Sequence, residues 1–146
     1  MRYKLLFFAL LLPFLFVCIF ASYADSVQNA KNMPVNYVAA YYFHGTLRCP
    51  TCYKLEQYSK EAIDANFKNE LASGKLVFKT VNVDEKANEH FVNDYQLYTK
   101  SLVISFVKDG KEAKFKNLAK IWEYVGNKQR FYDYVKEEIA AFLKEL

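Results

Sequence analysis

The chain of 146 residues is poor in the residues that build nucleotide and metal sites. Its four glycines stand apart from one another, so the sequence contains neither G-x-G-x-x-G nor a phosphate-binding loop. It therefore has no recognisable means of holding a flavin or a nicotinamide by itself. With only two histidines, zinc would find few ligands beyond cysteine. No basic run with interleaved aromatic residues occurs and the net charge is a mild +4, so we expect no nucleic-acid partner.

The first 24 residues have the pattern of a signal peptide. Arg2 and Lys4 precede an apolar stretch, 5–20, and small residues follow at the two positions that a signal peptidase inspects, ending at Ala24. We therefore expect export, to the periplasm or to the outer face of the cytoplasmic membrane. Two alternatives stay open: the stretch remains uncleaved as a membrane tether, or Cys18 carries a lipid.

The remaining chain reads as a short linker, 25–34, followed by one domain, 35–146. Its apolar runs and helical periodicities predict strands that alternate with helices, which indicates an α/β sheet. The first apolar run alternates little, as expected of a strand covered on both faces. Asp109-Gly110 is a strong turn signal, so the last two strands should be antiparallel. The predicted strands are 35–43, 76–83, 102–107 and 112–116, and the predicted helices are 52–71, 85–95, 118–125 and 131–146.

Cysteine is also scarce, with three copies, and two of them lie three residues apart in Cys49-Pro50-Thr51-Cys52. This tetrapeptide separates the first predicted strand from the first predicted helix. A proline at the first helical position loses no hydrogen bond, because the first amides of a helix have no partner within it. Cys49 would then occupy the N-cap, where free amides and the positive end of the helix dipole favour a thiolate.

The pair predicts thiol–disulfide exchange with a protein thiol or disulfide as partner, with the disulfide itself as the only redox group. Cys49 is the expected nucleophile, and Cys52, within the first turn, is the expected resolving thiol. Pro50 and Thr51 should set the redox poise. Arg48 would stabilise the thiolate further if it folds over the sulfur, and His44 could assist with proton transfer.

Two other functions use the same residues. His44, Cys49 and Cys52 have a spacing that could bind a soft metal ion such as Cu(I), or arsenic. Alternatively, the disulfide is inert and purely structural, although closing so short a loop stabilises a protein by only about 2 kcal/mol. A three-ligand metal site would need His44, whereas a redox site could lose it.

Several segments resemble the thioredoxin-like superfamily and, more narrowly, a family of exported bacterial proteins known as nitrophenyl compound nitroreductase subunits, which are associated with arsenic-related gene clusters. The similarity covers nearly all of the chain after the signal segment. It is carried by Tyr41-Tyr42-Phe43-His44-Gly45, Arg48-Cys49-Pro50-Thr51-Cys52, Asn82-Val83-Asp84, Asp94-Tyr95-Gln96-Leu97, Thr99-Lys100-Ser101 and Leu118-Ala119-Lys120-Ile121-Trp122.

The resemblance implies a thioredoxin-like three-layer α/β fold, with a mixed sheet of about four strands and flanking helices. It also implies that residues 99–101 form a partner-docking loop. Because the chain has no recognisable flavin or metal site, a nitroreductase role would make it an electron relay for a partner reductase subunit. The chain departs from ordinary thioredoxins at Ser101, which replaces a cis-proline, so we expect a trans Lys100-Ser101 bond. Aromatic residues also replace the buried acid of the first strand.

Overall fold

The computed structural model describes residues 34–146, which form one compact unit. The predicted signal segment 1–24, the possible tether, Cys18 and residues 25–33 of the predicted linker lie outside the described residues. Within 34–146, no helix combines the length and the apolar character needed to cross a membrane.

A four-stranded mixed sheet forms the centre of the domain, in the order β2-β1-β3-β4. The first strand pairs in parallel with the second and antiparallel with the third, so the apolar run becomes the central strand that its sequence predicts. Asp109 and Gly110 both have positive φ, at 51° and 73°, as a tight hairpin turn requires. The strands are β1 (Tyr37–His44), β2 (Leu76–Asn82), β3 (Ser101–Lys108) and β4 (Lys111–Asn117).

The helices follow the predicted order but differ in extent. The long helix predicted for 52–71 is divided at Phe67, whose φ of −131° leaves the helical region while its side chain is buried in the core. The helix predicted for 85–95 is shortened, because residues before it form turns in which Asn88 donates to the Asn82 carbonyl at 3.0 Å. The helices are α2 (Pro50–Asn66), α3 (Lys68–Ala72), α4 (His90–Asp94), α5 (Ile121–Tyr124) and α6 (Lys128–Leu143).

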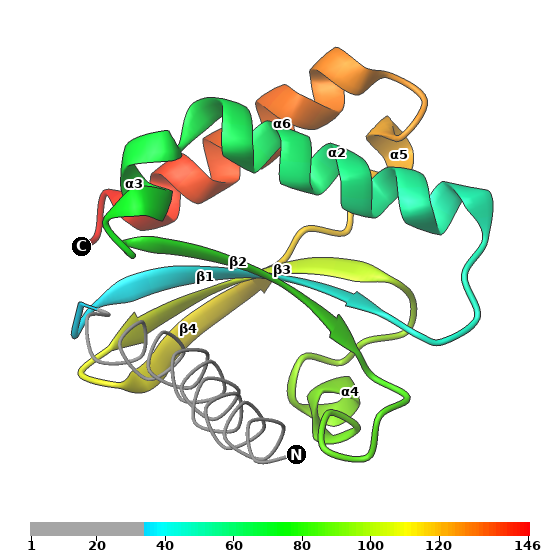
Figure 1. The fold of residues 1–146 in the computed structure, drawn as a ribbon, viewed down its shortest axis with the longest axis horizontal. Coiled ribbons are helices and arrows are strands. Elements are labelled where there is room, and N and C mark those ends of the chain that lie inside the picture. Colours follow the sequence, from blue (N-terminus) through cyan, green and yellow to red (C-terminus); the bar gives the residue numbers. More distant parts are fainter. Residues whose placement is uncertain (1–33) are drawn as a thin grey trace, which may run out of the picture. The chain divides into compact units, whose positions relative to one another are not determined.

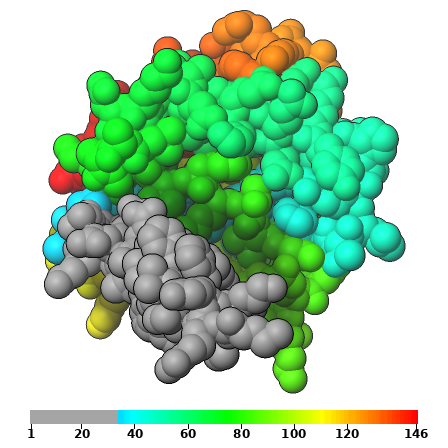
Figure 2. All heavy atoms as spheres, in the orientation of Figure 1, coloured from blue at the N-terminus to red at the C-terminus, as the bar shows by residue number. Residues whose placement is uncertain are grey.

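The described part of the chain has three layers (Figure 1). Alternate residues of β1, such as Val38, Ala40 and Tyr42, are buried in the larger core beneath α2 and α6. On the opposite face, Phe43 packs with Tyr95 in a smaller aromatic cluster beside α4. This arrangement confirms the predicted thioredoxin-like fold. Figure 1 also shows the β1–α2 loop and α4 at the same end of the sheet, and Figure 2 shows α2 along the molecular surface in the same orientation.

Helices α2 and α6 are joined at their surface by a cluster around Glu61. The Lys128 ammonium lies 2.8 Å from the Glu61 carboxylate, and the Tyr132 hydroxyl donates to the same oxygen. The Lys128 hydrogen bond, followed by that of Tyr132, lowers the pKa of Glu61 from 4.5 to about 2. Because the folded pKa lies below the unfolded one, this stabilisation is present above pH 4.5 and is lost as the pH falls toward 2.

We therefore expect Glu61→Gln to be less stable than the wild type at neutral pH, with a difference that shrinks as the pH falls through this window. Urea unfolding midpoints at a series of pH values measure the effect. Glu137→Gln, at an exposed acid of α6, is the matched control and should show no such convergence. A Glu61→Gln deficit that is the same at all pH values would contradict this assignment.

Candidate active site

Cys49 caps α2 as its sequence predicts. Its backbone is extended, with φ −83° and ψ 164°, and Pro50 follows as the first helical residue. The Cys49 carbonyl accepts the first backbone hydrogen bond of the helix, from the Cys52 amide at 2.9 Å. The Cys49 side chain is exposed, whereas Cys52 is buried, with 3% of its surface accessible. Only Cys49 can therefore meet a large substrate.

The sulfur of Cys49 lies within the first turn of the helix. The Cys52 amide is 3.3 Å from this sulfur. Hydrogen bonds from the Cys52 side chain and then from its amide lower the pKa of the Cys49 thiol, with the Thr51 amide adding to them. The free amides at a helix N-terminus thus stabilise a thiolate at the exposed cysteine, as the N-cap prediction requires.

Tyr42 of β1 contacts the backbone of Cys52. Its hydroxyl is buried and donates to the Cys52 carbonyl at 2.7 Å, which ties β1 to the first turn of α2. Burial raises the pKa of Tyr42, and the nearby Arg48 guanidinium opposes this rise. The phenol therefore remains a neutral donor at physiological pH, where a carboxylate in its place would be negatively charged.

Arg48 contacts two side chains of α2. Its guanidinium forms an ion pair with Glu56 of α2 and lies over the Tyr53 ring, 4.3 Å from its centroid. The Arg48 side chain is 13% exposed and that of Glu56 25% exposed. Arg48 is not among the largest contributions that lower the pKa of Cys49.

A second set of contacts holds the loop that leads into Cys49. The Asp84 carboxylate accepts a hydrogen bond from the Thr46 amide at 2.6 Å. The Asn82 side chain donates to the Thr46 hydroxyl at 3.2 Å and accepts from the Asp84 amide at 3.1 Å. A Cβ at position 45 would lie 3.0 Å from the Asp84 carboxylate, so any larger residue there would press on the side chain that holds Thr46. The end of β2 thus fixes the β1–α2 loop.

The predicted docking loop, 99–101, lies at the same end of the sheet as Cys49, because Ser101 pairs with Phe43 in the β3–β1 register. The Trp122 indole donates to the Lys100 carbonyl at 2.8 Å, and the Ser101 hydroxyl donates to the Thr99 carbonyl at 2.9 Å. No peptide bond in the described part of the chain is cis, so the Lys100-Ser101 bond is trans as predicted. Thr99 is exposed and Lys100 half-buried.

His44 ends β1, and its Nδ1 donates to the Gly45 carbonyl at 3.0 Å. Within residues 34–146, no group of three His, Cys, Asp or Glu side chains is arranged to hold a metal ion. The structure therefore does not bring His44, Cys49 and Cys52 together as a ligand set.

Sequence reasoning found the cysteine pair and missed the residues that support it. Tyr42, Glu56, Asp84 and Trp122 come from four different elements or loops, and each contacts the site only after the chain has folded. Asp84 and Trp122 belong to segments that carry the family resemblance, which was the one signal available for them. Tyr42 also lies in such a segment, but there it replaces an expected acid.

Comparisons with known proteins give similar structures and no sequence match. Neither a protein-family model nor a curated protein matches this sequence. A thioredoxin of Fasciola hepatica is similar in structure over 73% of this chain and 91% of its own, with 21% identity and a TM-score of 0.39. Oxidised thioredoxin O2 of Arabidopsis thaliana is similar over 77% of this chain and 88% of its own, with 12% identity and a TM-score of 0.41. For oxidised thioredoxin of Plasmodium falciparum the shares are 76% and 91%, with 17% identity and a TM-score of 0.40.

Proposed function

We propose that the protein is a thiol–disulfide oxidoreductase that works through Cys49 and Cys52. The observation that carries this proposal is the asymmetry of the pair. Cys49 is exposed at a helix N-cap with its thiol pKa lowered, and Cys52 is buried one turn further on. Such a pair supplies one reactive thiolate and one protected thiol, which is what two-step disulfide exchange requires.

In the reducing direction, the Cys49 thiolate attacks one sulfur of a substrate disulfide. A Cys49–substrate bond forms, the substrate S–S bond breaks, and the first substrate thiolate leaves. Cys52 then loses its proton to solvent or to the leaving thiolate and attacks Cys49, which releases the second substrate thiolate. The protein is oxidised by two electrons to the Cys49–Cys52 disulfide and the substrate is reduced by two. The reverse sequence oxidises a dithiol.

Two hydrogen bonds hold the cysteines in position for the second step, in which Cys52 attacks Cys49. The Tyr42 hydroxyl holds the backbone of Cys52 against β1. The hydrogen bond from the Thr46 amide to the Asp84 carboxylate holds the loop that precedes Cys49. The two cysteines are therefore positioned from two sides, which lowers the entropic cost of bringing their sulfurs together.

The pH dependence of alkylation tests the state of Cys49. In the reduced full chain, Cys49 should react with iodoacetamide at a pH below the range near 8.5 where an ordinary cysteine thiol ionises, because its folded pKa is lowered. Peptide mass spectrometry would locate the label. Cys52, which is buried, should react more slowly and serves as the internal control. Equal labelling of both cysteines, rising only above pH 8.5, would argue against a reactive thiolate and so against the function proposed here.

The finer assignment follows from the sequence. The signal-like segment 1–24 supports a place outside the cytoplasmic membrane, in the periplasm or tethered at its outer face. There the dithiol would serve a protein thiol or disulfide, or relay electrons to a partner reductase subunit that acts on nitroaromatic compounds. A partner subunit with its own flavin or metal centre is part of this proposal, since nitro-group reduction needs one.

A further inference from the structure

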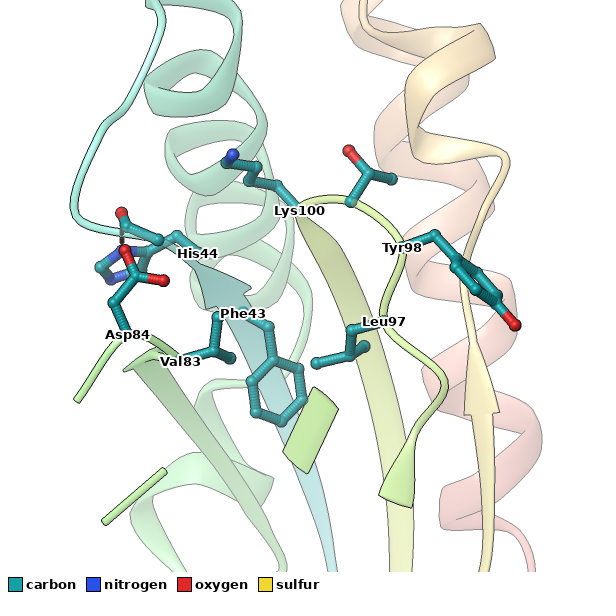
Figure 3. A pocket seen from close by; sticks show the side chains of 9 residues that line it. Phe43, His44, Val83, Asp84, Leu97, Tyr98 and Lys100 are labelled. Atoms are coloured by element: carbon teal, nitrogen blue, oxygen red, sulfur yellow. Dashed lines mark hydrogen bonds between the residues drawn. The ribbon is translucent and has the colours of Figure 1, made fainter. Parts of the chain in front are cut away.

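A hollow of about 160 Å³ lies between the loop leading to Cys49 and the docking loop. Its walls come from the ends of β1 and β2 and from the segment before β3, with Phe43, Val83 and Leu97 as the apolar lining. Sites for drug-sized ligands measure roughly 300–1,000 Å³, so this one admits only the end of a small molecule. Figure 3 shows Phe43 and Leu97 at its base.

The charged groups of the hollow are of opposite sign and stand apart. Figure 3 shows Asp84 and His44 along one wall, with the Lys100 side chain above the hollow, reaching from the loop before β3 toward that wall. Among the described residues, neither Asp84 nor Lys100 takes part in a salt bridge. Because Nδ1 of His44 donates to the Gly45 carbonyl, its Nε2 in the neutral ring is an acceptor. The hollow therefore offers hydrogen-bond acceptors at Asp84 and His44 and a cationic donor at Lys100.

We propose that this hollow binds the zwitterionic amino-acid end of a small thiol peptide or of its disulfide, the sulfur of which exchanges with Cys49. The ligand's ammonium group would meet Asp84 and His44, and its carboxylate would meet Lys100. The proposal rests on the function proposed above and names a substrate class for it.

The distance along the chain allows such a ligand to reach the nucleophile. Gly45 of the hollow and Cys49 are four residues apart, so their Cα atoms are separated by at most about 15 Å. The Thr46–Asp84 hydrogen bond holds the loop between them. A tripeptide spans up to about 11 Å when extended. That a thiol tripeptide seated by its amino-acid end presents its sulfur to Cys49 is part of the proposal.

Three disulfides that differ only at the relevant end provide the test. Glutathione disulfide carries both charges, the disulfide of glutaryl-Cys-Gly lacks the ammonium group, and the disulfide of 4-aminobutyryl-Cys-Gly lacks the α-carboxylate. All three have the same reacting sulfur, so their intrinsic exchange chemistry is matched. The second-order rate of oxidation of the reduced full chain should be about tenfold higher with glutathione disulfide than with either analogue, as loss of one charge-assisted hydrogen bond predicts.

Substitutions should remove these preferences one at a time. Lys100→Met should erase the preference over the 4-aminobutyryl analogue and keep the preference over the glutaryl analogue, and Asp84→Asn should do the reverse. Lys86→Met and Glu89→Gln, at exposed positions outside the hollow, are the matched controls and should keep both preferences. Asp84 also holds Thr46. If Asp84→Asn slows all three reactions equally, the result for Lys100→Met decides whether the hollow binds the amino-acid end.

The outcomes separate this inference from the proposed function. Equal rates with all three disulfides, or preferences that survive Lys100→Met, would overturn the hollow as the amino-acid site and leave disulfide exchange intact. A folded, reduced protein that reacts with none of the three would overturn the proposed function itself.

Discussion

Replacing Cys52 with serine is expected to convert the protein into a trap for its partners. The substitution changes the Cys52 side-chain hydrogen bond, which is the largest contribution to the lowered pKa of Cys49, but it keeps the backbone amides of residues 51 and 52, which also lower that pKa. Cys49 would therefore still attack a disulfide. The mixed disulfide would persist, because the resolving thiol is gone. An intramolecular group acts at an effective concentration far above millimolar external thiol, so resolution should slow by more than about 100-fold. Mass spectrometry of the full chain would identify the covalent adducts.

The matched variants are Cys49→Ser and the double change Cys49→Ser with Cys52→Ser, neither of which should form adducts. Turnover of a disulfide in the presence of dithiothreitol should be lost in all three variants. Adducts that remain after Cys49→Ser would place the nucleophile at Cys52 and contradict the assignment. Full turnover by Cys52→Ser would show that the buried cysteine has no part in resolution.

Replacing Glu56 with glutamine should cost about 2–3 kcal/mol of the free energy of unfolding. The substitution leaves the Arg48 guanidinium 87% buried, since its side chain is 13% exposed, without a counter-charge. Breaking a fully buried pair typically costs about 3–5 kcal/mol, and the 25% exposure of Glu56 reduces that figure. The Nε of Arg48 has no hydrogen-bond partner among the described residues. The loss of Glu56 would therefore add to hydrogen bonds that this guanidinium already lacks. Urea unfolding of the full chain measures the change.

A double substitution distinguishes charge from packing in this pair. Arg48→Met together with Glu56→Gln should recover most of the lost stability, because no unpaired charge then remains buried. Glu70→Gln, at a half-buried acid without an ion pair in the described chain, is the control and should change stability by less than about 0.5 kcal/mol. A Glu56→Gln variant as stable as that control would show that the pair contributes nothing measurable.

Features set by neighbouring residues were predictable from the sequence. The N-cap at Cys49 and the turn at Asp109-Gly110 depend on two or three adjacent residues, and both are found. The central position of β1 followed from its continuous apolar run. Helix limits were less accurate, because Phe67 leaves the helical conformation where its side chain enters the core, a choice made by packing rather than by local preference.

The support of the candidate site could not be read from the sequence in the same way. The ion pair between Arg48 and Glu56 joins the loop before Cys49 to α2, and no sequence pattern indicated it. Tyr42, read as an aromatic replacement for an acid, holds the Cys52 carbonyl from ten residues away. Asp84 reaches Thr46 across 38 residues, and Trp122 reaches Lys100 across 22. Residues so far apart in the chain meet only when the sheet has formed.

The sequence by itself thus determined where the candidate reactive atoms lie: two cysteines at a strand-to-helix turn, because an N-cap arises from contiguous residues. Tertiary structure decided what surrounds them. A buried neutral phenol, the ion pair of Arg48 with Glu56, and a hollow lined by charges of both signs all depend on side chains from separate elements and loops. The physical reason is that hydrogen bonds and ion pairs act over a few ångströms, so their partners are chosen by the fold.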